Sequence, residues 1–320
     1  MCKFRVWRIF ALWLLLSGLL TACGPSTFTL RLHFKRGDVF HVKMDTIQHM
    51  TQTIVGQDVK VNQQMVFEYT WEVADVNAAG DVTLKVTYDR LALRQEQNGE
   101  KRAYDSASGE TPSDFFKGVD LLVGKSFIVV LAPDGKVQSL TGLKEMLRQV
   151  ADETGLAKDE ADAFYESLLG GFGDQAMTEQ FNAFVNPYPQ KPLKVGSTWE
   201  SDVTLKVLFP LAVHNVYTVQ DWQDNRVTLK VNSILQSNSD KTMMPTGSPF
   251  AVRYNIGGTQ KGTIVVDVVT GLPRRSEIEQ HLQGNILLFD PQKNQGKTQS
   301  ALTVPLSMDS TTIVTAQRQK

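Results

Sequence analysis

Cysteine is nearly absent from this sequence, since only Cys2 and Cys23 among 320 residues carry a thiol. A fold of this length must therefore be stable without a disulfide framework. The apolar run at the N-terminus, Ile9 to Ala22, has 14 residues, whereas a membrane-spanning helix needs about 20. The sequence also lacks an excess of positive charge, since it has 33 Lys and Arg and 34 Asp and Glu. We therefore do not expect nucleic acid as a partner.

The sequence also lacks the motifs of common catalytic and metal sites. Neither G-x-S-x-G nor H-E-x-x-H occurs. His41 and His49 fall on one face of a predicted strand, but eight residues at 3.3 Å each place them about 26 Å apart, too far to share an ion. Glu68 and Glu72 lie about 13 Å apart by the same rise, too far for a glycosidase pair. We therefore predict no enzyme, metal site or cofactor, and keep an unrecognised hydrolase only as a third hypothesis.

The N-terminus has the pattern of a secretory signal. Three basic residues and no acid precede the apolar run. At its end, Leu20-Thr21-Ala22-Cys23 resembles the lipobox of bacterial lipoproteins. The resemblance implies that residues 1–22 are a signal peptide, that cleavage precedes Cys23, and that lipid attached to Cys23 anchors the mature chain in a membrane. Cys2 would then be lost with the signal peptide.

The residues after Cys23 indicate where the anchor would hold the protein. In Gram-negative cells of the enteric type, an aspartate at the next position would signal retention in the inner membrane, and this chain has Gly24. We therefore expect a cell-envelope protein on the outer membrane, facing the periplasm, rather than on the inner membrane. Arg31, Lys35 and Arg36 follow without any acid, where anionic lipid head groups would attract them.

Alternating apolar and polar residues predict a mainly β fold. In 59–73 the odd positions hold Val59, Val61, Met65, Phe67, Tyr69, Trp71 and Val73, with polar side chains between them. Further strand-like runs lie at 82–88, 203–209, 226–235, 262–269, 275–288 and 300–315. Because several runs reach about 15 residues, we expect long antiparallel strands in a strongly curved sheet. Asp267, inside the run "IVVDVV", could be a buried acid with a shifted pKa, but the alternation favours the solvent face.

Three short blocks recur in the same order along the chain. Residues 34–40 match 193–199, "VTLKV" occurs at 82–86 and again at 227–231, and 128–130 match 264–266. Repeated blocks in a constant order favour two related β units, which we place at 23–140 and 186–320.

The segment between the two units, 141–185, changes to a helical period. Leu143, Met146, Leu147 and Val150 have the spacing of an amphipathic helix, and further helices are predicted at 158–169 and 177–185. The run "LLGGFG" at 168–173 breaks the pattern. We expect this helical insert to cover the concave face of the sheet. Its glycines would be a hinge if the insert opens, or would end a helix if it is a fixed plug: Gly170, Gly171 and Gly173.

Aromatic side chains of both β units are candidates for that concave face. They are Phe67, Tyr69 and Trp71 in the first unit and Trp199, Tyr217 and Trp222 in the second. Such residues can fill a core or line a site for an apolar ligand.

The whole pattern resembles a family of uncharacterised bacterial lipoproteins of unknown function. The likeness rests on the lipobox, the K-x-G-[DS]-x-[FW] blocks at 35–40 and 194–199, the "VTLKV" strand, and a hydrophobic strand that ends near a glycine turn. The predicted architecture is also similar, at fold level, to half-barrel lipoprotein carriers. We expect a membrane-anchored lipoprotein that binds an apolar or lipidic ligand, or an envelope protein, on a curved β surface. The alternative is a structural or interaction lipoprotein with a filled core.

Overall fold

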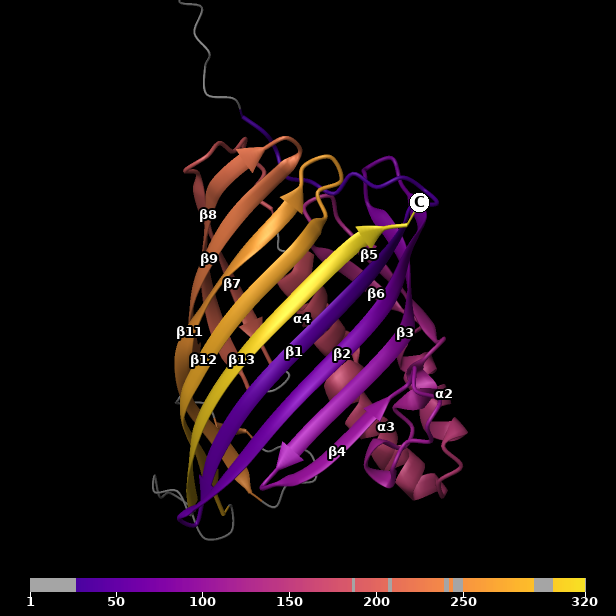
Figure 1. Cartoon of the computed structure of the whole chain (residues 1–320), viewed down its shortest axis with the longest axis vertical. Helices are drawn as coiled ribbons and strands as arrows, with labels where there is room; N and C mark the ends of the chain where they lie inside the picture. Colours follow the sequence, from indigo (N-terminus) through magenta and orange to yellow (C-terminus); the bar gives the residue numbers. More distant parts are fainter. Residues whose placement is uncertain are drawn as a thin grey trace, which may run out of the picture.

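The computed structural model describes residues 27–185, 188–206, 209–238, 242–243, 250–290 and 302–319. The predicted signal peptide and Cys23 lie outside these residues. Within them, one 13-stranded sheet wraps around a group of helices, as Figure 1 shows. The strand pairs among these residues are antiparallel, which confirms the predicted mainly β fold with a long antiparallel sheet. No helix in this part of the chain is long and apolar enough to cross a membrane.

The strands are long, as the sequence runs predict. The first half contributes β1 (Val39–Ile54), β2 (Gln57–Val76), β3 (Val82–Gln97), β4 (Glu100–Asp105), β5 (Ser126–Leu131) and β6 (Val137–Thr141). The second half contributes β7 (Thr198–Leu205), β8 (Leu211–Gln223), β9 (Arg226–Ser237), β10 (Thr242–Met243), β11 (Ala251–Asp267), β12 (Pro273–Phe289) and β13 (Leu302–Arg318). Two short 3-10 helices, η1 (Asp114–Phe116) and η2 (Asp120–Leu122), lie between β4 and β5.

The two halves of the chain form one continuous sheet. Its strand order is β6-β5-β3-β2-β1-β13-β12-β11-β9-β8-β7, with β4 beside β3 and β10 beside β11. The first and last strands join the halves, because β1 pairs with β13 from Phe40 opposite Arg318 to Gln52 opposite Leu306.

Several details of backbone geometry recur in the two halves. Gly37 donates its N–H to the carbonyl of Val73 at 2.9 Å, and Gly196 donates to that of Val219 at 2.8 Å. The register of β2 against β3 shifts just after Val73, and that of β8 against β9 shifts just after Val219. The recurring "VTLKV" blocks therefore occupy equivalent places beside these shifts.

The third pair of blocks aligns one residue differently from the sequence match. Val129 lies opposite Leu84 of the first "VTLKV" block, and Ile264 lies opposite Leu229 of the second. Strand pairing therefore relates Val129, rather than Ile128, to Ile264.

The helical insert forms α2 (Leu143–Glu153), α3 (Lys158–Phe172) and α4 (Asp174–Val185). The break lies later than the run "LLGGFG" predicts, since α3 continues through Gly170 and Gly171. The chain leaves the helix only at Gly173, where ψ is 177°. A Cβ atom there would clash with the carbonyl oxygen of Leu169, whereas one on Gly170 or Gly171 would meet open space.

The N-terminal segment, residues 27–38, closes one end of the curved sheet. Phe28 and Leu193 exchange backbone hydrogen bonds of 2.9 and 2.7 Å. Leu32 then donates to Pro133 at 2.7 Å and His33 to Thr270 at 2.9 Å, so the segment connects loops from both halves. Its path across the top of the sheet is visible in Figure 1. We call this end of the molecule the closed end.

Asp267 does not lie on the solvent face as predicted. Its side chain is buried at the end of β11, where it accepts N–H bonds from Val269 at 2.9 Å and Thr270 at 3.0 Å. The guanidinium of Arg274 pairs with its other oxygen. The strand turns at this residue, so simple alternation no longer sets the direction of its side chain.

Candidate functional site

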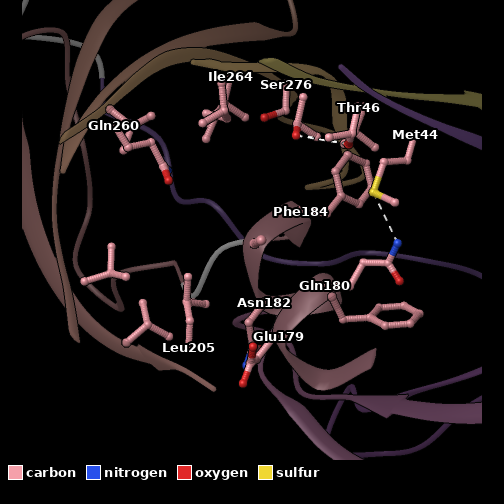
Figure 2. A pocket seen from close by; sticks show the side chains of 18 of the residues that line it. Met44, Thr46, Glu179, Gln180, Asn182, Phe184, Leu205, Gln260, Ile264 and Ser276 are labelled. Carbon is pink, nitrogen blue, oxygen red and sulfur yellow. Dashed lines mark hydrogen bonds between the residues drawn. The ribbon is translucent and has the colours of Figure 1, made fainter. Parts of the chain in front are cut away.

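A cavity of about 310 Å³ lies between α4 and the concave face of the sheet. Figure 2 shows Gln180, Asn182 and Phe184 of α4 on one side and Gln260, Ile264 and Ser276 of the sheet on the other. Strands of both halves contribute to its wall, from β1 and β2 through β13 and β12 to β7. The single continuous sheet therefore brings residues more than 200 positions apart into one site.

The wall formed by the first half is packed by aromatic rings. Trp71 stacks on Phe181 of α4 with ring centroids 4.9 Å apart, and Phe184 meets the same indole edge-on at 5.7 Å. Both phenylalanines lie on the face of α4 that is buried against the sheet. These contacts hold α4 over the concave face, where the apolar stripes of the insert lead us to expect it.

Tyr69 joins this wall to the polar side of α4. Its hydroxyl oxygen accepts a hydrogen bond from Nε2 of Gln180 at 3.3 Å, and the same nitrogen lies 3.2 Å from the sulfur of Met44. Burial raises the pKa of Tyr69 well above its ordinary value, and the Gln180 hydrogen bond offsets only part of that increase. The phenol is therefore neutral at every physiological pH.

The wall formed by the second half is centred on Tyr217. Its ring stacks on that of Trp199 with centroids 5.1 Å apart. Burial raises the pKa of Tyr217 to about 12, so this phenol is neutral as well. Trp222 lies farther toward the closed end, where its ring packs at 4.7 Å on Phe28 of the N-terminal segment.

The six aromatic residues proposed from the sequence therefore separate into two groups. Tyr69, Trp71 and Tyr217 line the cavity, whereas the other three pack into the core beside it: Phe67, Trp199 and Trp222. Phe67 meets Phe172 of α3 edge-on at 6.0 Å. The three glycines proposed as a hinge lie in or after α3 and do not line the cavity.

A row of uncharged polar side chains crosses the sheet at the level of the cavity. Each member is the direct cross-strand partner of the next, so all of them share one face. From β3 to β7 the members are Gln95, Gln63, Gln48, Ser310, Gln280, Gln260, Ser233, Asn215 and Ser201. We call these nine residues the polar row. Five of them line the cavity: Ser310, Gln280, Gln260, Asn215 and Ser201.

The polar row was not predicted from the sequence, although several of its members interrupt an apolar alternation. Gln280, for instance, stands between Ile278 and Leu282, and Ser233 stands between Val231 and Leu235. One polar residue in one strand has no meaning by itself. The row becomes visible only when the strand register places the nine residues side by side.

Charge is scarce around the cavity. Among the described residues that line it, only Glu179 carries a formal charge. Its Oε1 accepts the backbone N–H of Lys206 at 2.8 Å and the side-chain amide of Gln175 at 2.9 Å. No group of three or more His, Cys, Asp or Glu side chains in the described part of the chain could hold a metal ion.

The comparisons with known proteins give a family but no activity. A family model described as "Family of unknown function (DUF6263)" matches residues 79–273, in agreement with the resemblance noted from the sequence. The lipobox lies outside this match. No curated protein matches the chain.

The solved structures that match this chain do so only distantly. Lipovitellin, described in "Lipid-protein interactions in lipovitellin", shares 12% identity and a TM-score of 0.47, over 90% of this chain and 26% of that one. This chain thus spans about a quarter of the lipovitellin chain. OccK7 of Pseudomonas aeruginosa shares 7% identity and a TM-score of 0.28 over 89% of this chain and 100% of that one. DynF of Micromonospora chersina shares 7% identity and a TM-score of 0.18, over 91% and 85%. Similarities of this size carry no argument about function.

Proposed function

This chain belongs to DUF6263, a family of unknown function, and we propose that it binds an apolar or lipidic ligand between α4 and the concave face of its sheet. The cavity is the observation that supports this role. Its volume of about 310 Å³ falls at the lower end of the range for small-molecule sites, roughly 300–1,000 Å³. Contact with its aromatic and aliphatic walls would remove apolar ligand surface from water, which makes the free energy of binding more favourable.

We propose binding rather than catalysis as the role of this site. The carboxylate of Glu179 is held by the N–H of Lys206, and the phenols of Tyr69 and Tyr217 stay protonated. Neither phenol is poised to exchange a proton near neutral pH.

Lipid extraction tests the binding role. The chain from residue 24 onward contains every described element, and it would be purified without detergent, extracted with organic solvent and examined by mass spectrometry. We expect a co-purified lipid in about equimolar amount. Val203→Trp, which adds bulk on the lining edge strand β7, should reduce it, whereas Thr204→Trp on the opposite face should not. An extract without lipid from every form would favour the filled-core alternative.

We also propose that Cys23 is lipidated and holds the protein on a membrane of the cell envelope. Only four residues lie between Cys23 and Phe28, which is fixed to Leu193. The five Cα–Cα steps from Cys23 to Phe28 reach about 18 Å at most when the chain is extended. The closed end would then lie next to the membrane. Three basic residues on the exposed side of the N-terminal segment support this orientation, because anionic head groups attract them: Arg31, Lys35 and Arg36.

Cell fractionation tests the anchor. Cys23→Ser should give an unlipidated precursor or a soluble form, and the unchanged protein should sediment with outer-membrane markers on a density gradient. A Cys23→Ser protein of mature size that still fractionates with membranes would contradict the proposed anchor. Recovery of the unchanged protein with inner-membrane markers would contradict the proposed location alone.

We further propose that the two halves of the sheet arose by duplication of one β unit. The matching turns at Gly37 and Gly196 and the matching register shifts after Val73 and Val219 support this origin. Duplication would explain why a single ligand site is built from similar walls on both sides.

A further inference from the structure

We propose that the ligand is an uncharged amphiphile whose polar group, a hydroxyl, ester or amide, binds to the middle of the polar row. This inference rests on the proposed function and specifies the chemical class of ligand. It starts from a difference in hydrogen bonding within the row. Two pairs beside the centre bind each other, whereas the central glutamines Gln260 and Gln280 do not bind each other; the end member Gln95, whose buried Oε1 also lacks a partner among the described residues, does not line the cavity.

One hydrogen-bonded pair lies on each side of the centre of the row. Nε2 of Gln63 donates to Oε1 of Gln48 at 2.8 Å, and the hydroxyl of Ser233 donates to Oδ1 of Asn215 at 2.7 Å. Gln48, Ser233 and Asn215 are buried, so these bonds replace the water that the side chains lose on folding.

The centre of the row is open toward the cavity. The amide of Gln260 has no hydrogen-bond partner among the described residues, and Figure 2 shows its side chain on the cavity wall opposite α4. Gln280 accepts one long bond of 3.5 Å from the hydroxyl of Ser310, which leaves its amide nitrogen without a described partner. Across the cavity, Oδ1 of Asn182 is buried and also lacks a partner among these residues.

Unpaired amides in a largely apolar cavity favour a polar ligand group beside them. A primary amide both donates and accepts, so it can pair with a hydroxyl, an ester or another amide. A ligand that supplies such a group removes the cost of leaving Gln260 and Gln280 unpaired when water is displaced.

The same lining disfavours a charged ligand group. Among the described residues that line the cavity there is no Lys, Arg or His, so a phosphate or carboxylate would lose its hydration without an ion-pair partner. An ammonium group would find only Glu179, whose carboxylate already accepts the Lys206 N–H. Neutral amphiphiles therefore fit better than anionic or cationic ones.

Apolar surface continues on both sides of the polar row. Val231 and Ile264 line the cavity toward the closed end, and Val213 and Leu205 line it on the other side. The latter pair adjoins a separate apolar cluster built around Leu211, Leu235, Ile256, Leu282, Leu306 and Met308. When the polar group of the ligand binds to the row, its hydrocarbon part can therefore pack against apolar lining on either side.

A displacement assay with the chain from residue 24 onward tests the inference. Diphenylhexatriene, a hydrocarbon probe without a polar group, would be bound first and then displaced by 1-decanol, decanoate or decylammonium, three competitors with equal chains. The variant Gln260→Leu/Gln280→Leu removes the open centre of the row. Thr259→Val, beside Gln260 but exposed on the convex face, is the matched control, and thermal unfolding checks that each variant folds.

We expect the double variant to bind the probe at least as tightly as the unchanged protein but to need about tenfold more decanol for displacement, since two hydrogen bonds are lost. Thr259→Val should behave like the unchanged protein, and both ions should displace the probe more weakly than decanol. If the double variant does not fold, Gln280→Leu alone should give a smaller weakening in the same direction. Equal decanol displacement from the variant and the unchanged protein, or ions as effective as decanol, would overturn this inference while leaving apolar binding intact. Failure of the unchanged protein to bind the probe or any competitor would overturn the proposed function, and this inference with it.

Discussion

The side chain of Asp267, at the end of β11, stabilises the closed end through hydrogen bonds to Val269, Thr270 and Arg274. Burial alone would raise the pKa of its carboxyl, but the hydrogen bonds from Arg274 and from the backbone of Thr270 and Val269 lower it below the ordinary value. The ionised form is therefore the one that the fold stabilises.

We predict that Asp267→Asn lowers the free energy of unfolding by about 1–3 kcal/mol at pH 7, because a charged hydrogen bond to Arg274 is lost. A folded pKa below the unfolded one stabilises the native state above the unfolded pKa, and this stabilisation is lost as pH falls through the folded pKa. Urea unfolding should therefore show the two proteins converging below about pH 4. A difference that stays constant from pH 7 to pH 3 would show that the carboxylate charge is not involved.

Gly171 and Gly173 of the insert differ in whether the backbone around them leaves room for a Cβ atom. Gly171 lies inside α3 with open space beyond its Cβ position, so Gly171→Ala should raise the free energy of unfolding by about 0.5–1 kcal/mol. Gly173→Ala should lower it by about 1 kcal/mol or more, because its Cβ would clash with the Leu169 carbonyl. Urea unfolding of both variants measures these changes in the free energy of unfolding. Effects of the same sign would contradict the assignment of the junction to Gly173.

At the scale of elements, α4 is the part of the insert on which the cavity depends. Phe181 is 3% exposed and stacks on Trp71, so Phe181→Ala should lower the free energy of unfolding by about 3–5 kcal/mol. It should also enlarge the cavity and admit bulkier probes. Gln175→Ala, on the exposed side of the same helix, is the control and should change stability by less than about 0.5 kcal/mol. A Phe181→Ala protein with unchanged stability and unchanged probe binding would show that α4 is not a wall of the site.

The sequence predicts the strands and helices better than it predicts the contacts between distant segments. Alternation in 59–73 correctly indicates the strand that becomes β2, and the helical period at 141–185 correctly indicates the insert. These patterns are local, because one buried face sets them. The closing of the sheet by residues 27–38 depends on loops near Pro133 and Thr270, which no local pattern connects. The separation of the aromatic residues into lining and core has the same cause, since contacts with distant segments decide it: Trp71 meets α4, Phe67 meets α3, and Trp222 meets Phe28.

The polar row could not be predicted from the sequence either, because it depends on strand register. Its members are ordinary Gln, Ser and Asn residues in separate strands, and a shift of one residue in any strand pair would turn that strand's member to the other face. Bulges such as the one after Val219 cannot be placed from one sequence, so the register had to come from the structure. The uncharged character of the cavity, which decides the proposed class of ligand, was therefore hidden in the sequence.

At the scale of the whole molecule, one sheet joins both halves of the chain, the N-terminal segment closes one end, and α4 covers the concave face over the cavity. The central claim is that an apolar or lipidic ligand occupies that cavity. A decanol derivative with a diazirine group in its chain would be bound to the chain from residue 24 onward, photolysed and located by peptide mass spectrometry. We expect saturable labelling of α4 and of the concave residues of β12 and β13, suppressed by excess decanol and reduced in Val203→Trp. Labelling confined to the convex face, or labelling that does not saturate, would contradict it.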